Sequence, residues 1–191
     1  MSLQKLFVAA AVAVCAVPAA AQDVYVLEPA HSQPVWETRH IGMALQRGSF
    51  GKASGKITLD RAARKGTVDI TIDANSIKPF DARLDPILRG PRFFNVEKFP
   101  TMEFKGDDVV FDGDRVVRVS GNFTMLGVTK PLTLQVADFK CGEQAFNKKP
   151  MCAADATGTV KRSEYGMTDG LAIGNPADEI RLLIPVEAYK E

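Results

Sequence analysis

Histidine is scarce in this chain, which contains only His31 and His40 among its 191 residues. The two lie nine residues apart rather than at the i, i+2 spacing that places side chains on one face of a strand, and no cysteine or cluster of carboxylates accompanies them. The sequence also lacks a Gly-x-Ser-x-Gly elbow and a glycine-rich phosphate-binding loop. These absences leave metal, hydrolytic and nucleotide-dependent chemistry without a supporting motif.

The chain also has almost no net charge. The chain has 24 Lys and Arg against 23 Asp and Glu, and removal of the first 21 residues leaves 23 of each. This balance gives no electrostatic reason to expect nucleic acid or an anionic membrane as a partner. No repeat, low-complexity tract or linker divides the chain, so we expect residues 22–191 to form a single domain.

The first 21 residues have the pattern of a secretory signal peptide. Lys5 supplies a positive charge, Leu6 to Val17 form an apolar core, and Ala19-Ala20-Ala21 offers a small-residue cleavage site. This segment is too short and wrongly flanked to span a membrane. We therefore expect cleavage after Ala21 and export of the mature protein to the periplasm.

Two of the three cysteines, Cys141 and Cys152, remain after that cleavage. An even number of cysteines in an exported chain favours a disulfide. The bridge would close the polar loop 142–151 between two strand-like runs. Since no histidine lies nearby, a redox or metal pair is the weaker interpretation, and we expect a structural disulfide.

Alternation of apolar and polar residues dominates most of the remaining sequence. In residues 67–74, for example, Val68, Ile70 and Ile72 alternate with threonine and aspartate. Asp112-Gly113 between two apolar runs predicts a hairpin. Eight to ten evenly spaced strands favour a closed antiparallel barrel or a sandwich. We expect a soluble barrel, because the strands read as short, one face is charged and the chain lacks a terminal aromatic residue, unlike outer-membrane barrels.

The segment from Pro79 to Phe104 interrupts this pattern with many apolar side chains, several prolines and one glycine. It predicts a partly helical insertion, with a short helix around residues 81–90, that plugs one end of the barrel or lines the entrance to an apolar cavity. Arg83 and Asp85 lie within it. They are either solvated charges or polar contacts for a ligand head group, since ligand pockets combine apolar walls with a few placed polar groups.

Several different short motifs follow one another in a specific order along nearly the whole mature chain. They include Tyr25–Ser32 (YVLEPAHS), Gly48-Ser49-Phe50, Phe99–Phe104 (FPTMEF), Gly121–Thr124 (GNFT) and Lys161–Met167 (KRSEYGM). In order and spacing the chain resembles the YceI-like polyisoprenoid-binding family of exported proteins. It departs from the family pattern where Leu84 separates Arg83 from Asp85, which are usually adjacent, and where Ile87 replaces a common histidine.

The resemblance implies an all-β, lipocalin-like antiparallel barrel of about eight strands whose interior holds a long isoprenoid tail, such as that of a quinone or polyprenyl lipid. The candidate ligand-binding residues are Trp36, Phe50, Leu84, Leu88, Phe93, Phe94, Met102, Phe104, Phe123, Arg83 and Asp85. We expect a non-enzymatic carrier with no cofactor or metal beyond its lipid, no nucleic-acid partner and no stable membrane insertion; a homodimer stays open.

Two other classes of function stay open. An enzyme of isoprenoid or quinone metabolism would need His31, His40, Arg83 and Asp85 to converge on one site. A stress-related interaction module would be favoured by a barrel filled by its own side chains, as eight-stranded barrels can be. The interior of the barrel is therefore the feature that separates these hypotheses.

Overall fold

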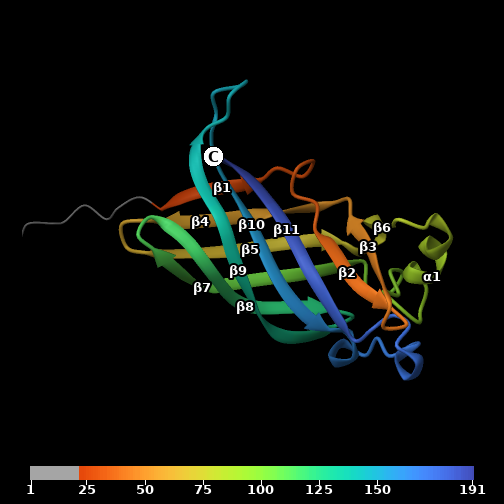
Figure 1. The fold of residues 1–191 in the computed structure, drawn as a ribbon. Coiled ribbons are helices and arrows are strands. Elements are labelled where there is room, and N and C mark those ends of the chain that lie inside the picture. The colour runs from red at the N-terminus through yellow and green to blue at the C-terminus, as the bar shows by residue number, and fades with distance from the viewer. Residues whose placement is uncertain (1–21) are drawn as a thin grey trace, which may run out of the picture.

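A computed structural model describes residues 22–191 (Figure 1). The predicted signal peptide, residues 1–21, lies outside the described residues. Within residues 22–191, no helix is both long enough and apolar enough to cross a membrane.

Eleven strands make up most of the described chain: β1 (Asp23–Leu27), β2 (Val35–His40), β3 (Ala44–Phe50), β4 (Ala53–Asp60), β5 (Lys65–Asp73), β6 (Ile77–Pro79), β7 (Thr101–Asp112), β8 (Arg115–Met125), β9 (Val128–Glu143), β10 (Pro150–Lys161) and β11 (Glu179–Lys190). The helical elements are short: α1 (Asp85–Arg89) and the 3-10 turns η1 (Ala74–Ser76), η2 (Ala82–Leu84), η3 (Arg162–Tyr165) and η4 (Leu171–Ile173).

The strands close into a barrel in which each strand pairs antiparallel with its neighbours. The order around it is β1-β4-β5-β7-β8-β9-β10-β11, and β1 pairs back with β11. β2 pairs with the first half of β11, where Trp36 faces Leu182, whereas β1 pairs with its last residues. Strands β2, β3 and β6 thus extend one end of the wall. The predicted all-β barrel of eight antiparallel strands is confirmed.

The expectation of short strands is wrong for the second half of the chain, where β7 to β11 have 11 to 16 residues each. Bulges explain the error. The register of β7 against β8 shifts between Gly106 and Asp108 and again after Val110, so the alternation breaks while the strand continues. The hairpin predicted at Asp112-Gly113 is confirmed, and Gly113 has the positive φ of 60° that such a turn favours.

The helical insertion is also confirmed. The Asp81 side chain accepts a hydrogen bond of 3.0 Å from the Arg83 backbone N–H and so caps η2, which leads directly into α1. Pro86 lies in the first turn of α1, and the helix ends at Gly90. This segment lies at one end of the barrel, which we call the α1 end (right in Figure 1), with the β2–β3 turn and residues 162–178.

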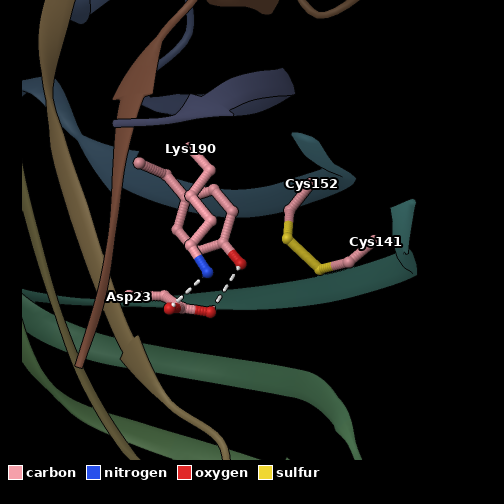
Figure 2. The surroundings of a disulfide bond; sticks show 5 residues. Asp23, Cys141, Cys152 and Lys190 are labelled. Carbon is pink, nitrogen blue, oxygen red and sulfur yellow. Dashed lines mark hydrogen bonds and ion pairs between the residues drawn. A yellow bond between two sulfur atoms is a disulfide. The ribbon is translucent and has the colours of Figure 1, made fainter. Parts of the chain in front are cut away.

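The β4–β5, β7–β8 and β9–β10 turns lie at the opposite end, which we call the hairpin end. Here Cys141 of β9 and Cys152 of β10 face each other directly and form the predicted disulfide (Figure 2). Beside it, the Lys190 ammonium lies 2.7 Å from the Asp23 carboxylate, and its hydrogen bond lowers the pKa of Asp23. These contacts fasten both termini of the described chain to the barrel wall.

Candidate functional site

The interior of the barrel contains a cavity of about 700 Å³. Strands β1 to β5 and β7 to β11 all contribute lining side chains, and so does the insertion around α1. Most of these side chains are aliphatic or aromatic. The barrel is therefore hollow and its inner surface is apolar.

Residues of β11 show the hollow interior most clearly. Ile180, Leu182, Ile184 and Val186 alternate along the strand, and all four line the cavity. The lining on β11 runs from Ile180 to Ala188, which corresponds to about 26 Å along the strand. Because strands in barrels are tilted against the barrel axis, this length gives the cavity a depth of about 20 Å.

All nine apolar residues proposed from the sequence line this cavity: Trp36, Phe50, Leu84, Leu88, Phe93, Phe94, Met102, Phe104 and Phe123. The insertion joins the wall through an edge-to-face contact between Phe94 and Phe50, whose ring centroids lie 5.4 Å apart. Phe93 is buried beside them. All nine therefore surround one space, and binding of a ligand by them stays a prediction.

The structure separates Arg83 from Asp85. Arg83 lies at the edge of the cavity with an exposed side chain, and its guanidinium is 2.7 Å from the Asp81 carboxylate. Hydrogen bonds from Arg83 hold the pKa of Asp81 down at about 2. Asp85 is not among the lining residues and instead pairs with Arg89 at 3.2 Å. Residues two apart in a helical segment do not face each other, which explains why these two do not form a joint site.

The cavity opens at the α1 end. The lining residues that are exposed to solvent there are His40, Arg83, Ile87 and Arg92. No lining residue at the hairpin end is exposed: Tyr25, Leu59, Val116 and Cys152 are buried, and Val109, Phe139 and Ala153 are half-buried. Large exposed apolar residues also gather around the opening, namely Ile41, Met43, Leu45, Phe80, Ile87 and Ile173. The site is thus a blind channel with one apolar-rimmed mouth.

The two histidines do not converge. His40 lies at the mouth, whereas His31 lies on the outside, where its Nδ1 is 2.8 Å from Glu28 and 3.7 Å from Glu187. The ligand atoms of Glu28, His31 and Glu187 lie within 4.8 Å of one another, a spacing that could accommodate a metal ion. Burial alone would raise the pKa of Glu28, but hydrogen bonds from the backbone of His31 and Ala30, together with the His31 ring, lower it overall. This cluster is an outer-surface feature, separate from the cavity.

Sequence reasoning missed the buried polar residues that hold the α1 end together. Arg162 is 1% exposed and donates to three backbone carbonyls, those of Ala177, Met167 and Pro176, at 3.1, 2.9 and 2.7 Å. Burial lowers the pKa of its guanidinium. Because all three acceptors belong to residues 167–177, Arg162 fixes that segment at the mouth. In the sequence, the only signal for Arg162 was its place in the KRSEYGM motif, residues 161–167.

Comparison with known proteins matches residues 25–188 to the YceI-like domain. The chain belongs to the YceI-like family. Protein YceI of Salmonella arizonae is 31% identical over 165 residues, which cover 86% of this chain and 84% of that protein.

Solved structures show the same fold at lower identity. BcnA of Burkholderia cenocepacia superposes with a TM-score of 0.69 and 21% identity, over 84% of this chain and 98% of BcnA. A domain from Saccharophagus degradans, described as a polyisoprenoid binding domain, superposes with a TM-score of 0.64 and 15% identity, over 87% of this chain and 98% of that domain. The barrel is therefore the architecture that these proteins share.

Proposed function

We propose that this YceI-like protein binds a long isoprenoid lipid, whose tail lies along the barrel axis. The observation that carries the proposal is the deep apolar channel with one mouth. Its volume of about 700 Å³ falls within the range of about 300–1,000 Å³ that is usual for sites that enclose a small molecule. A narrow channel some 20 Å deep suits an extended chain better than a compact ligand.

The hydrophobic effect supplies the affinity. At about 0.8 kcal/mol per buried CH₂, a tail of about twenty carbons offers on the order of 16 kcal/mol. Association and the ordering of the flexible chain offset much of this. Apolar walls select a tail by its length and shape, so the protein would accept several lipids unless groups at the mouth select among head groups.

Two further observations support a carrier rather than an enzyme. His31 and Asp85 lie outside the cavity lining, so the four polar residues that an enzyme would need do not meet there. The polyisoprenoid description of the structural relative from S. degradans points in the same direction. We also propose that the protein acts in the periplasm, since the signal-peptide pattern and the Cys141–Cys152 disulfide suit an oxidising compartment.

The direct experiment is to purify the protein from its native host, extract it with organic solvent and identify the lipid by mass spectrometry. We expect about one isoprenoid lipid per chain. Protein that carries no hydrophobic guest, and that acquires none from isoprenoid vesicles, would contradict the proposal.

A pair of variants tests the assignment of the walls. Phe94→Ser removes the ring that contacts Phe50 in the channel, so it should abolish lipid uptake while circular dichroism still shows a folded barrel. Phe146→Ser is the matched control, because Phe146 is 92% exposed at the tip of the β9–β10 hairpin. Equal uptake by both variants would refute the assignment.

A further inference from the structure

The large exposed apolar side chains of residues 22–191 gather at the mouth of the channel. Six of the eight lie there, whereas only Val26 and Phe146 lie elsewhere. Three of the six have most of their surface in water, since Met43 is 77% exposed, Phe80 79% and Ile173 66%. A concentration of this kind marks a contact with a membrane or with another protein. We call the six residues the mouth patch: Ile41, Met43, Leu45, Phe80, Ile87 and Ile173.

Backbone hydrogen bonds hold the parts of the mouth patch in place. The Ile41 N–H donates to the Gly174 carbonyl at 2.9 Å, which fastens the β2–β3 turn to the segment that Arg162 fixes. The Phe80 N–H donates to the Arg47 carbonyl of β3 at 3.3 Å. The patch is therefore a pre-formed set of tips around the opening at the α1 end (Figure 1).

The β2–β3 turn places an isoleucine where the backbone disfavours it. The Met43 N–H donates to the His40 carbonyl at 3.0 Å and closes a tight turn, in which Ile41 has a φ of 53° and Gly42 a φ of 67°. Turns with two positive φ values favour glycine, asparagine or aspartate, and a β-branched residue in this conformation is an outlier. Such an outlier points to function rather than to stability. Here the turn presents an exposed apolar side chain at the mouth.

The mouth also carries an excess of positive charge, although the mature chain has none overall. Residues 35–47, 78–92 and 168–175 contain six Lys and Arg against four Asp and Glu. The exposed Arg39 guanidinium donates to the Met43 carbonyl at 2.8 Å, so one of these charges lies directly against the tip of the β2–β3 turn. Cations among exposed apolar side chains are the combination that binds the surface of an anionic bilayer.

The shape of the mouth patch favours a bilayer over a protein partner. Its side chains stand on separate tips around an open channel, and a folded protein placed there would have to fill that opening to pack well. A fluid bilayer conforms to separate tips. A long lipid tail is strongly unfavourable in water, so an exchange at the point of contact avoids that state.

We therefore propose that the mouth patch docks on the surface of an anionic phospholipid bilayer, so that a lipid passes between bilayer and channel without entering water. This inference rests on the proposed function and specifies the place of exchange. The contact is peripheral and reversible, because only the tips reach the boundary between head groups and acyl chains. Met43, Phe80 and Ile173 contribute most, since they are the most exposed residues of the patch.

Flotation of the mature protein with vesicles tests the contact directly. One set of vesicles contains phosphatidylcholine alone and the other contains about one third phosphatidylglycerol, and neither contains isoprenoid lipid. We expect the protein to bind the anionic vesicles about 10-fold more tightly, and salt to weaken this binding. Equal binding to both sets would refute the preference for an anionic surface.

A double variant and its control test which residues touch the bilayer. Met43→Ser combined with Phe80→Ser should lower vesicle binding about 10-fold or more, because two apolar side chains leave the interface. Phe146→Ser is the matched control, since Phe146 is 92% exposed but lies on the β9–β10 hairpin, away from the mouth. It should leave vesicle binding unchanged. An equal loss in both variants would refute the placement of the contact at the mouth.

Ile41→Asn separates a membrane contact from a structural role. Asparagine adopts the left-handed conformation more readily than isoleucine, so the melting temperature should stay the same or rise. Vesicle binding should nevertheless fall about 3- to 10-fold, because an apolar side chain leaves the interface. A folded variant that binds vesicles as well as the wild type would refute the placement of this turn at the membrane.

Delivery of an isoprenoid lipid from cyclodextrin distinguishes the two proposals, because it bypasses the vesicles. The Met43 and Phe80 double variant should take up this lipid as the wild type does, since neither residue lines the cavity, yet it should transfer lipid between vesicles more slowly. If the wild type takes up no lipid from cyclodextrin, the proposed function fails. If it takes up lipid but binds neither set of vesicles, the function stands and docking is refuted. A dimer in analytical ultracentrifugation that the double variant dissociates, without vesicle binding, would assign the mouth patch to a second copy of the chain and also refute docking.

Discussion

Filling the channel from inside is a sharp test of whether the barrel is hollow. Ala156 of β10 lines the cavity, is 5% exposed and is paired with Val136 of β9 and Ile184 of β11, which also line it. In Ala156→Phe, the new ring would extend into the space that the lipid tail is proposed to occupy. The variant should therefore lose lipid uptake without losing the fold.

The sign of the stability change distinguishes an empty channel from a packed core. A phenylalanine side chain buries about 100 Å² more apolar surface than alanine, which is worth about 2.5 kcal/mol at 25 cal/mol per Å². Loss of rotamer freedom reduces this to about 2 kcal/mol. If the channel is empty, the melting temperature of the unliganded protein should rise by about 4–8 °C. If side chains already fill the interior, overpacking should destabilise it by about 1–3 kcal/mol.

Differential scanning calorimetry on delipidated protein gives the melting temperature, and extraction of lipid-loaded protein gives the stoichiometry. Ala137→Phe is the control, because Ala137 of β9 is exposed outside the barrel and should tolerate the ring with little change. A clear fall in melting temperature for Ala156→Phe, with none for Ala137→Phe, would refute the reasoning.

Three further predictions follow from contacts around the barrel. Replacing Cys141 and Cys152 together by serine should lower the free energy of unfolding by up to about 3 kcal/mol, measured by urea denaturation, because the cross-link closes an 11-residue separation; an unchanged midpoint would contradict this. The pKa of Asp81 is lowered from 3.8 to about 2 when folded, so the stability that its ion pair adds is complete above about pH 4 and lost as the pH falls through 2. Asp81→Asn should therefore flatten the pH dependence of the urea midpoint between pH 4 and 2, and an identical slope in both proteins would count against the pair. Gly48→Ala should displace the indole that lies against it and shift the tryptophan emission, whereas Gly142→Ala, with no neighbouring atom near its Cβ, should leave the emission unchanged.

Alternation survives in most strands, so the sequence predicted an all-β barrel or sandwich. The lipocalin-like barrel with an apolar interior was implied chiefly by the resemblance to the YceI-like family, and the insertion, with large apolar residues such as Phe93 and Phe94, was expected to plug or line one end of it. What the sequence could not predict was the length of β7, since the bulges after Gly106 and Val110 break the alternation without ending the strand.

Polar contacts were the least predictable part of the site. The sequence left Arg83 and Asp85 as either solvated charges or head-group contacts, and the structure pairs them with Asp81 and Arg89. Arg162 looked like an ordinary charged residue. Its burial becomes evident only when the fold brings the carbonyls of Met167, Pro176 and Ala177 around it.

Native mass spectrometry of the protein isolated under gentle conditions from its host tests the central claim most directly. We expect the chain without residues 1–21, carrying a single noncovalent adduct whose fragments are those of an isoprenoid lipid, and we expect Ala156→Phe to lack that adduct. A mass equal to the bare polypeptide under conditions that preserve lipid adducts on other carriers would contradict the claim that this barrel shelters a lipid.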